Sequence, residues 1–161
     1  NVVIDDGKRY DIKETIISNE MVAIASLPQD SEGGRYQAEG AKLTGGAKIA
    51  KDHAGHDGKG YVEGFYNSST ANATFAVEAP ELGTYNLNLR YAAGHNACKN
   101  LGLYVNGEKS EVLDIKSTGD WAVWGNHPVS VFLKGGLNTI TFKPDSESPD
   151  TVNLDFIQIT E

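Results

Sequence analysis

Short runs of alternating apolar and polar residues recur along the chain and restrict its fold more than any other feature. In the clearest run, Tyr85, Leu87, Leu89 and Tyr91 alternate with polar residues. Successive side chains of a strand point to opposite faces, so this run predicts a strand with one buried face. Further runs cover residues 47–50, 72–78, 101–105, 111–115, 121–131, 137–142 and 151–160. No long segment has the 3.6-residue period of a helix, so the sequence predicts an all-β fold.

The connections between these runs are short and rich in turn residues. Asn106-Gly107 is the strongest hairpin signal, and Gly45-Gly46 marks another turn. Parallel strands need crossovers of about a dozen residues or more, whereas antiparallel strands need only a tight turn. The 161 residues include 18 glycines, more than the roughly 7% that is usual, as many turns would require. We therefore expect an antiparallel β-sandwich of jelly-roll type.

Residues 1–34 differ in pattern from the rest of the chain. Residues 9–17 and 21–27 are apolar and β-capable, Ser18-Asn19-Glu20 separates them, and residues 28–34 are polar. This predicts an N-terminal β-hairpin and linker over 1–34, either the tail of a preceding domain or an extra pair of strands packed on the main domain. The main domain is expected over 35–161. Because the chain begins at Asn1 without Met, we expect it to be part of a longer protein.

The net charge restricts which partners the chain can bind, and the cysteine content restricts how its fold can be stabilised. Asp and Glu number 22 against 14 Lys and Arg, a net charge of -8, which argues against nucleic acid and anionic membrane. An acidic chain fits a secreted, cation-binding protein. The one cysteine, Cys98, cannot form an internal disulfide, so stability must come from packing or metal. A thiol mechanism using Cys98 and nearby His95 is the less common reading, because a free cysteine usually behaves as a small buried hydrophobe.

The last predicted strand, 151–160, places a carboxylate among apolar residues. Val152, Leu154 and Phe156 are expected on one face, and Asn153 and Asp155 on the other. Beyond Phe156 the residues are apolar on both faces, so the strand should lie inside a covered sheet and Asp155 should be poorly exposed. A buried carboxylate costs several kcal/mol unless a cation, N–H donors or a metal meets it.

A second segment favours a metal among these alternatives. In Tyr36-Gln37-Ala38-Glu39, two oxygen-bearing side chains two residues apart would share one face of a short strand. Gln37 and Glu39, joined by Asp155 from the distant last strand, would suit Ca²⁺, which binds six to eight oxygens. The alternative is that Glu39 and Asp155 are separate surface or salt-bridged carboxylates.

Several segments together resemble carbohydrate-binding modules of family 35, which are related to family 6. They are Tyr36-Gln37-Ala38-Glu39-Gly40-Ala41, residues 58–65 (GKGYVEGF), 83–92, 103–107 (LYVNG), 118–121 (TGDW), 133–140 and 152–156 (VNLDF). The resemblance covers about residues 35–161. It implies a calcium-containing jelly-roll β-sandwich that binds glycans without catalysis. It also implies a structural calcium held by Gln37, Glu39 and Asp155, although the family commonly has Glu at position 37.

The resemblance also implies a sugar site at the loop end of the sandwich, formed here by Tyr61, Trp121 and Asn153. An aromatic ring can cover the C–H face of a pyranose, and an amide can bond its hydroxyls. Trp121 and Trp124 are three residues apart, so on one strand they would face opposite ways, with Trp124 in the core. The alternative is that both tryptophans, and Tyr61, are packing residues. Loop 52–57 contains two histidines and is interpreted as a polar surface loop rather than a transition-metal site.

The sequence thus predicts a secreted, extracellular, non-catalytic module that brings an attached carbohydrate-active enzyme to polysaccharide. Uronic-acid-bearing plant-wall glycans are the first expected ligand, with a second calcium in the sugar site left open. Neutral galacto-, manno- or α-gluco-oligosaccharides are the alternative, and a protein-binding adhesion or assembly sandwich is the rival class. No Gly-x-Ser-x-Gly motif and no recognisable acid/base carboxylate pair is present, so we do not expect an enzyme.

Overall fold

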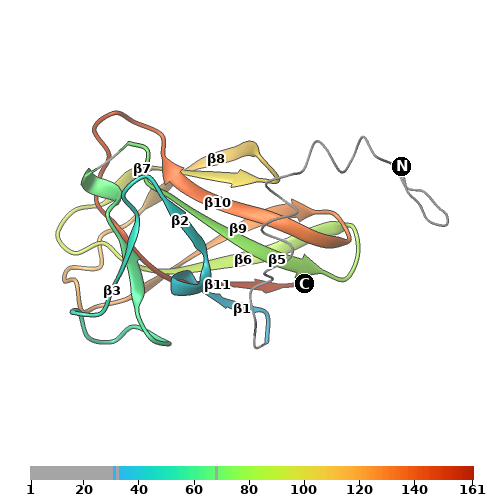
Figure 1. Cartoon of the computed structure of the whole chain (residues 1–161), viewed down its shortest axis with the longest axis horizontal. Coiled ribbons are helices and arrows are strands. Elements are labelled where there is room, and N and C mark those ends of the chain that lie inside the picture. The colour runs from blue at the N-terminus through green and yellow to red at the C-terminus, as the bar shows by residue number, and fades with distance from the viewer. Residues whose placement is uncertain (1–30, 32, 68) are drawn as a thin grey trace.

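The computed structural model describes residues 31, 33–67 and 69–161, which form two layered β-sheets (Figure 1). One sheet contains β1 (Arg35–Gln37), β3 (Lys48–Ala50), β4 (Tyr61–Glu63), β6 (Gly83–Ala92), β9 (Gly125–Leu133) and β11 (Asn153–Thr160). The other contains β2 (Lys42–Thr44), β5 (Asn72–Ala79), β7 (Cys98–Val105), β8 (Glu108–Ile115) and β10 (Gly136–Pro144). The helices of the described residues are two 3-10 turns, η1 (Ala38–Gly40) and η2 (Phe65–Asn67). The predicted N-terminal hairpin and most of its linker lie outside the described residues.

The strand pairing confirms the predicted antiparallel β-sandwich. The first sheet has the order β3-β4-β11-β6-β9, with β1 also paired to β11, and the second has the order β2-β5-β10-β7-β8. Every pair is antiparallel. The last strand, β11, lies inside its sheet, as its apolar composition predicts. Among the described residues, no helix is long and apolar enough to cross a membrane.

The core lies between the two sheets and is built from the alternating runs. Tyr85, Leu87, Leu89 and Tyr91 all point into it and are buried. The facing sheet contributes aromatic residues such as Phe75, whose ring packs edge-on against that of Phe142, with 5.9 Å between centroids. Edge-to-face contact is a favoured arrangement of aromatic rings.

The two turns with strong sequence signals differ in what they connect. Asn106-Gly107 joins β7 and β8 as a hairpin, with both residues at positive φ (50° and 88°), as a two-residue I′ turn requires. Gly45-Gly46 does not make a hairpin. It carries the chain from β2 in one sheet to β3 in the other.

A β-bulge in β11 reverses the side-chain alternation that the sequence predicts there. Leu154 pairs with Tyr91 and Phe156 pairs with Arg90, so Asp155 is an extra residue opposite no partner. Leu154 remains in the core between the sheets, but Phe156 does not join it. The expectation that Leu154 and Phe156 share a face is therefore wrong, because the extra residue shifts the phase by one.

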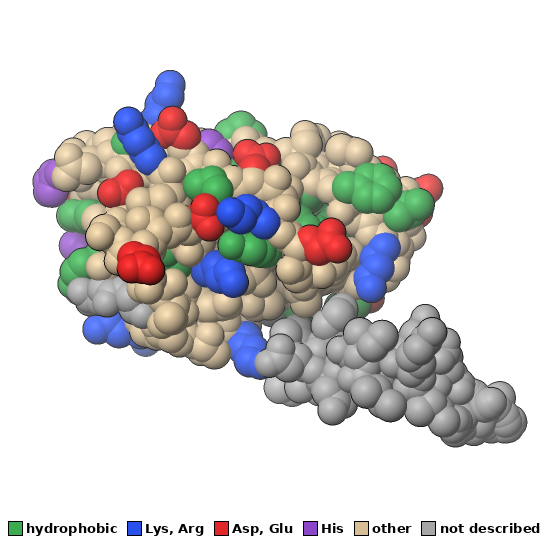
Figure 2. Space-filling model, turned by 90° about the horizontal axis from the view of Figure 1, so that it is seen from above, with side chains coloured by type: hydrophobic (Ala, Val, Ile, Leu, Met, Phe, Trp, Pro, Cys, Tyr) green, Lys and Arg blue, Asp and Glu red, His purple; other side chains and the backbone are tan. Residues whose placement is uncertain are grey.

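Charged side chains of both signs are interspersed over the surface. Figure 2 shows one face of the molecule, on which Lys and Arg lie among Asp and Glu without forming a continuous basic patch. A basic patch or stripe is the electrostatic footprint of nucleic-acid binding, so this face offers no such footprint.

Candidate functional site

A pocket of about 320 Å³ lies at the loop end of the sandwich and brings two of the three predicted sugar-site residues together. Its lining residues are His53, Glu63, Tyr66, Trp121, Thr151 and Asn153. Trp121 comes from the loop before β9, and Asn153 is the first residue of β11. The Asn153 side chain forms no hydrogen bond with another described residue, so its amide is available to a ligand. A partly exposed ring beside such an amide is suited to a sugar.

The Trp121 indole is held in place from several sides. The His53 ring stacks on it at 6.2 Å between centroids, and the His95 ring meets it edge-on at 6.4 Å. A Cβ atom at Gly94 would lie 2.3 Å from the indole, so only glycine fits there. The indole is therefore positioned before any ligand arrives, which lowers the entropy lost on binding.

Tyr61, the third predicted sugar-site residue, is placed in the interior. Its exposed fraction is 0%, and the rings of His53, His56 and Trp124 lie around it at 5.4 to 5.9 Å. Its hydroxyl donates a 2.6 Å hydrogen bond to Asp52. The expectation that Tyr61 offers a ring face to sugar therefore needs correction: it is a packing residue whose ring contacts that of His53.

The buried phenol of Tyr61 leads to an alkaline stability prediction. Burial, and secondly the Asp52 carboxylate, raise the pKa of Tyr61 above its ordinary value. The unfolded state loses this proton near pH 10 while the folded state keeps it, so the free energy of unfolding falls as pH rises above about 10. In urea denaturation at pH 8 and about 11, we expect a smaller fall for Tyr61→Phe than for the wild type. Equal falls in both proteins would contradict this role of Tyr61.

Trp124 and Trp121 lie in the loop before β9, which begins only at Gly125. The prediction that they occupy one strand, with Trp124 in the core, is therefore wrong, and both side chains are half-buried. The Trp124 indole N–H donates to the Ala54 carbonyl at 2.9 Å. Trp124 thus fixes loop 52–57, which in turn supports the pocket.

Tyr66 and Glu63 are pocket residues that the sequence reasoning missed. The Tyr66 ring is 58% exposed at η2, whereas its neighbour Phe65 is buried. Two adjacent aromatic residues in one short turn cannot both point into the core. The sequence pair Phe65-Tyr66 could therefore have indicated that one of the two rings is exposed. Glu63 ends β4 and lies 3.6 Å from the Lys48 ammonium.

A second polar cluster surrounds Asp155, which is fully buried as predicted. Both of its carboxylate oxygens accept the Asp57 backbone N–H at 3.0 Å, and Oδ2 also forms an ion pair with Arg90. Arg90 donates in addition to the Gly55 carbonyl at 3.0 Å. Burial raises the pKa of Asp155, while the Asp57 N–H and Arg90 oppose the rise. A cation and an N–H donor, two of the three partners expected from the sequence, thus meet this carboxylate.

Gln37 and Glu39 join the same cluster from the other side of segment 57–59. Gln37 donates to the Asp57 carboxylate at 2.6 Å, and the Lys59 N–H donates to Glu39 Oε2 at 2.8 Å. A Cβ atom at Gly58 would lie 2.4 Å from Glu39 Oε2 and 2.9 Å from Gln37 Oε1. The fold therefore brings Gln37, Glu39 and the surroundings of Asp155 together around one loop.

The donor chemistry of this cluster fits a calcium ion on its Glu39 side. Glu39 Oε1 is buried, accepts no hydrogen bond from a described residue, and Glu39 forms no ion pair with a described cation. Carboxylate and amide oxygens are the ligands that Ca²⁺ prefers. On its Asp155 side, Arg90 already supplies positive charge. Within the described ranges, no group of three His, Cys, Asp or Glu is arranged to hold a metal, so the amide of Gln37 would have to contribute.

Cys98 is a core residue of the sandwich. It is 1% exposed, and burial raises the pKa of its thiol to about 11. The reactive thiolate is therefore scarce at neutral pH. This agrees with the interpretation of Cys98 as a small buried hydrophobic residue.

Comparison with known proteins identifies the family. The model of carbohydrate binding module family 35 matches residues 34–160. The chain belongs to family 35. The solved family 35 module from Clostridium thermocellum has 30% sequence identity and a TM-score of 0.71, over 78% of this chain and 95% of that one. A family 35 module from Paenibacillus barcinonensis has 32% identity and a TM-score of 0.71, over 80% and 99% of the two chains.

The curated relatives of this family 35 module are much longer enzymes. A 1,6-alpha-glucosyltransferase from Sporosarcina globispora is 37% identical over 76% of this chain and 10% of its own length. A cycloisomaltooligosaccharide glucanotransferase from Niallia circulans is 32% identical over 88% of this chain and 15% of its own length. The module thus spans between a tenth and a sixth of these relatives. It is a carbohydrate-binding module of a kind that is attached to glycoside hydrolase-type enzymes.

Proposed function

We propose that the module binds neutral α-glucan chains at the loop-end pocket and does so without catalysis. The observation that carries this proposal is the meeting of the packed Trp121 indole with the available Asn153 amide in one pocket. Trp121 would cover the C–H face of a glucose unit, Asn153 would bond its hydroxyls, and Tyr66 would add a second ring. Tyr61 would not contact the sugar as predicted, and would instead support this surface by packing in the interior.

The charge of the pocket favours a neutral sugar over the uronic acid that was the first expectation. Glu63 is the one charged residue type among the six lining residues, and no Lys or Arg lines the pocket. A uronate carboxylate would meet the Glu63 carboxylate there, which the Lys48 ammonium outside the lining pairs with at 3.6 Å, and no lining Lys or Arg would receive it. Hydroxyl groups instead match the amide, carboxylate and phenol side chains.

The names of the relatives support α-glucan within the neutral class. They include the 1,6-alpha-glucosyltransferase, an isomaltosyltransferase from Sporosarcina globispora and an isomalto-dextranase from Arthrobacter globiformis. A related module also occurs in an exo-beta-D-glucosaminidase from Amycolatopsis orientalis, so the family accompanies other specificities as well. We infer an extracellular role in which the module raises the concentration of an attached enzyme at its polysaccharide.

Affinity electrophoresis of the module tests this function. We expect retardation in gels containing dextran, an α-1,6-glucan, and little in gels containing xylan or polygalacturonate. Retardation by polygalacturonate that EDTA abolishes would favour the uronate reading with a second calcium. A lack of retardation in every glycan gel would favour the protein-binding class instead.

We further propose that Gln37, Glu39 and Asp155 belong to a structural calcium site. The cluster contains three carboxylates, those of Glu39, Asp57 and Asp155, of which Asp57 pairs with Arg35 and Asp155 with Arg90, which leaves one negative charge. Glu39 Oε1, which accepts no hydrogen bond from a residue that the structure describes, is where that charge is least compensated. A bound cation there would stabilise the folded state by mass action.

Thermal unfolding with and without calcium tests the metal proposal. At a calcium concentration 100 times Kd, we expect stabilisation of about 2.7 kcal/mol, which corresponds to a rise in Tm of roughly 5–11 °C for a domain of this size. Glu39→Gln should remove most of this rise, whereas Glu81→Gln, at an exposed turn, should keep it. A Tm that does not respond to calcium would exclude the site.

A further inference from the structure

The outer face of the sheet β3-β4-β11-β6-β9 carries a patch without charged residues, which we call the uncharged face. It consists of residues of β6, β9 and β11 that alternate with core residues and point outward: Thr84, Asn86, Asn88, Pro128, Ser130, Phe132, Gln158 and Thr160. All eight are exposed or half-buried. Charged residues make up 22% of the chain, so eight positions would hold about two at that average, and more at a surface, where charged side chains gather.

The strand register gathers these residues into three rows. The rows are Phe132 with Thr84, then Ser130 with Asn86 and Thr160, then Pro128 with Asn88 and Gln158. Side chains at paired positions stand beside one another on one face of a sheet. Strands about 4.8 Å apart and rows about 6.8 Å apart give the face an area of roughly 300 Å². Beyond the third row the Arg35 guanidinium lies 4.2 Å from the centre of the Phe156 ring and 3.2 Å from the Asp57 carboxylate, so the uncharged face ends there.

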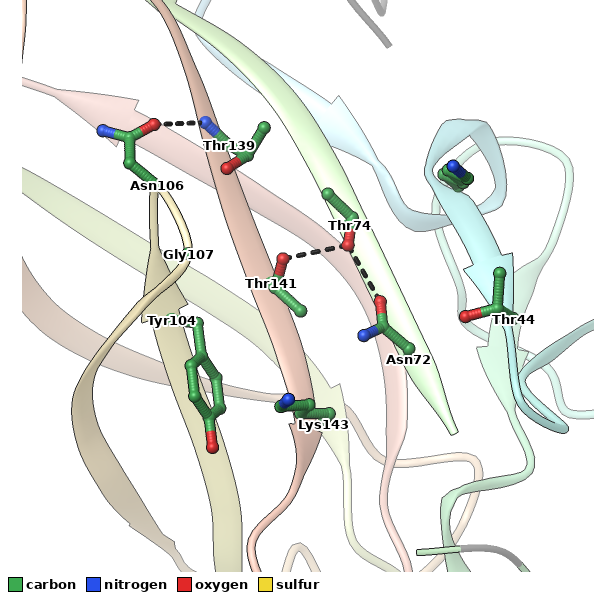
Figure 3. A pocket seen from close by; sticks show the side chains of 10 residues that line it. Thr44, Asn72, Thr74, Tyr104, Asn106, Gly107, Thr139, Thr141 and Lys143 are labelled. Carbon is green, nitrogen blue, oxygen red and sulfur yellow. Dashed lines mark hydrogen bonds between the residues drawn. The ribbon is translucent and has the colours of Figure 1, made fainter. Parts of the chain in front are cut away.

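The outer face of the second sheet differs in shape and charge. It is hollowed into a pocket of about 390 Å³, with Lys42 and Lys143 among the lining residues (Figure 3). The hydroxyls of Thr74 and Thr141 lie 2.9 Å apart in this pocket. The lack of charge is therefore a property of one sheet face and not of the strand surfaces of this protein in general.

The uncharged face presents apolar surface at one end and amide groups across its middle. The Phe132 ring is 62% exposed, and Leu82, one residue before β6, is 64% exposed. The Asn88 amide donates to Asn126 Oδ1 at 2.8 Å, which uses one N–H and leaves the second for a partner. The cores of protein interfaces are likewise depleted of charged residues and enriched in aromatic ones. The composition of this face is thus typical of a contact surface.

Both ends of the described domain lie at the uncharged face. The Gly33 carbonyl accepts an N–H of the Gln158 amide at 3.1 Å, and the Glu161 carbonyl accepts one from Asn86 at 3.3 Å. Figure 1 shows the C-terminus beside β1, where the domain begins. The module spans 10% and 15% of two curated relatives. The remainder of such an enzyme would therefore emerge beside this face, whichever end of the module it continues from.

The area of the uncharged face distinguishes between possible partners. Contact over the whole face would bury roughly 600 Å² in total, which is the lower limit for an interface between domains of one chain. Separate proteins, or two copies of the module, need about 1,200 Å² or more for a stable, specific complex. A domain joined by a short connection is held at a millimolar effective concentration and needs less affinity. The face is thus large enough for an attached domain and too small for a free partner.

We propose that the uncharged face docks the module against the adjoining domain of the enzyme that carries it. That domain would present a surface of low charge, with an apolar recess for the Phe132 ring and polar groups for the amides. β11 runs from Asn153, in the loop-end pocket, to Thr160, on this face, a length of about 25 Å. Docking would leave the sugar pocket open and hold it at a fixed distance from the enzyme. This proposal rests on the attachment to an enzyme proposed above, but not on which sugar the pocket binds.

Hydroxyl-radical labelling, read out by mass spectrometry, tests the docking because it reports the exposure of individual side chains. The full-length enzyme is compared with the 161-residue module. Labelling of Phe132 and Leu82 should be largely lost in the full-length enzyme. Tyr66, which is 58% exposed in the loop-end pocket, is the matched control and should be labelled equally in both proteins.

A charge placed on the uncharged face should undo the docking. Ser130→Glu in the full-length enzyme should restore the labelling of Phe132 to the level of the module. Ser110→Glu, at an exposed position on β8, should not. Both variants of the isolated module should keep the Tm of the wild type, because neither serine is buried.

Three results would overturn the proposal. Equal labelling of Phe132 in the module and the full-length enzyme would show that no domain covers the face. Loss of this labelling in the isolated module as its concentration rises, with dimers in sedimentation, would make the face a contact between copies. Protection of Phe132 by dextran would make it a glycan surface. Dextran should instead protect Tyr66 and Trp121, and its failure to do so would count against the α-glucan site and not against the docking face.

Discussion

Trp121→Ala is expected to weaken binding of isomalto-oligosaccharides by roughly 30- to 150-fold, or about 2–3 kcal/mol. The indole lines the loop-end pocket, and His53, His95 and Gly94 hold it in place. A positioned aromatic loses little freedom on binding, so its removal should cost nearly the full contact energy. Isothermal titration calorimetry measures this change directly.

Phe132→Ala is the matched control for this prediction. Phe132 is an aromatic residue on β9 that is 62% exposed and lines neither pocket. Its removal takes away a similar exposed ring and should leave affinity unchanged. Equal losses in both variants, or no loss in Trp121→Ala, would place sugar binding elsewhere on the module.

Asp155→Ala is expected to lower the free energy of unfolding by about 3–5 kcal/mol, and Tm by roughly 6–20 °C. The carboxylate is fully buried, so its removal leaves the Arg90 guanidinium and the Asp57 N–H without their acceptor. Arg90 is 27% exposed and can turn partly toward water, which favours the lower end of the range. Thermal and urea unfolding in EDTA measure the ion-pair contribution separately from any calcium.

The surface pair of Lys109 and Asp145 provides the comparison. Both side chains are at least one-third exposed and lie 3.1 Å apart, so Asp145→Ala should cost no more than about 1 kcal/mol. If Asp155→Ala costs as little as Asp145→Ala, Asp155 does not organise this end of the sandwich.

The sequence predicted the sandwich because alternation is read directly from residues such as Tyr85 and Leu87. It did not predict the β11 bulge, because an inserted residue breaks the alternation without leaving a turn signal of its own. The bulge was visible in the sequence only indirectly, through the apolar residues that follow Phe156. Once Asp155 is recognised as the extra residue, the change of phase has a physical cause.

Only part of the site could be predicted from the sequence, for similar reasons. Trp121 and Asn153 come from segments far apart in sequence, and only the family resemblance placed them together. The burial of Tyr61 depends on His53, His56 and Trp124, which pack around it from loops that no periodicity describes. A cation was among the alternatives for the partner of Asp155, but Arg90 could not be chosen, because the strand register that joins the two residues includes the bulge.

A crystal structure of the module with isomaltotetraose tests the central claim most directly. A glucose ring stacked on Trp121, with a hydroxyl within hydrogen-bond distance of the Asn153 amide, is the predicted result. Sugar bound elsewhere, with Trp121 and Asn153 in contact only with solvent, would contradict it.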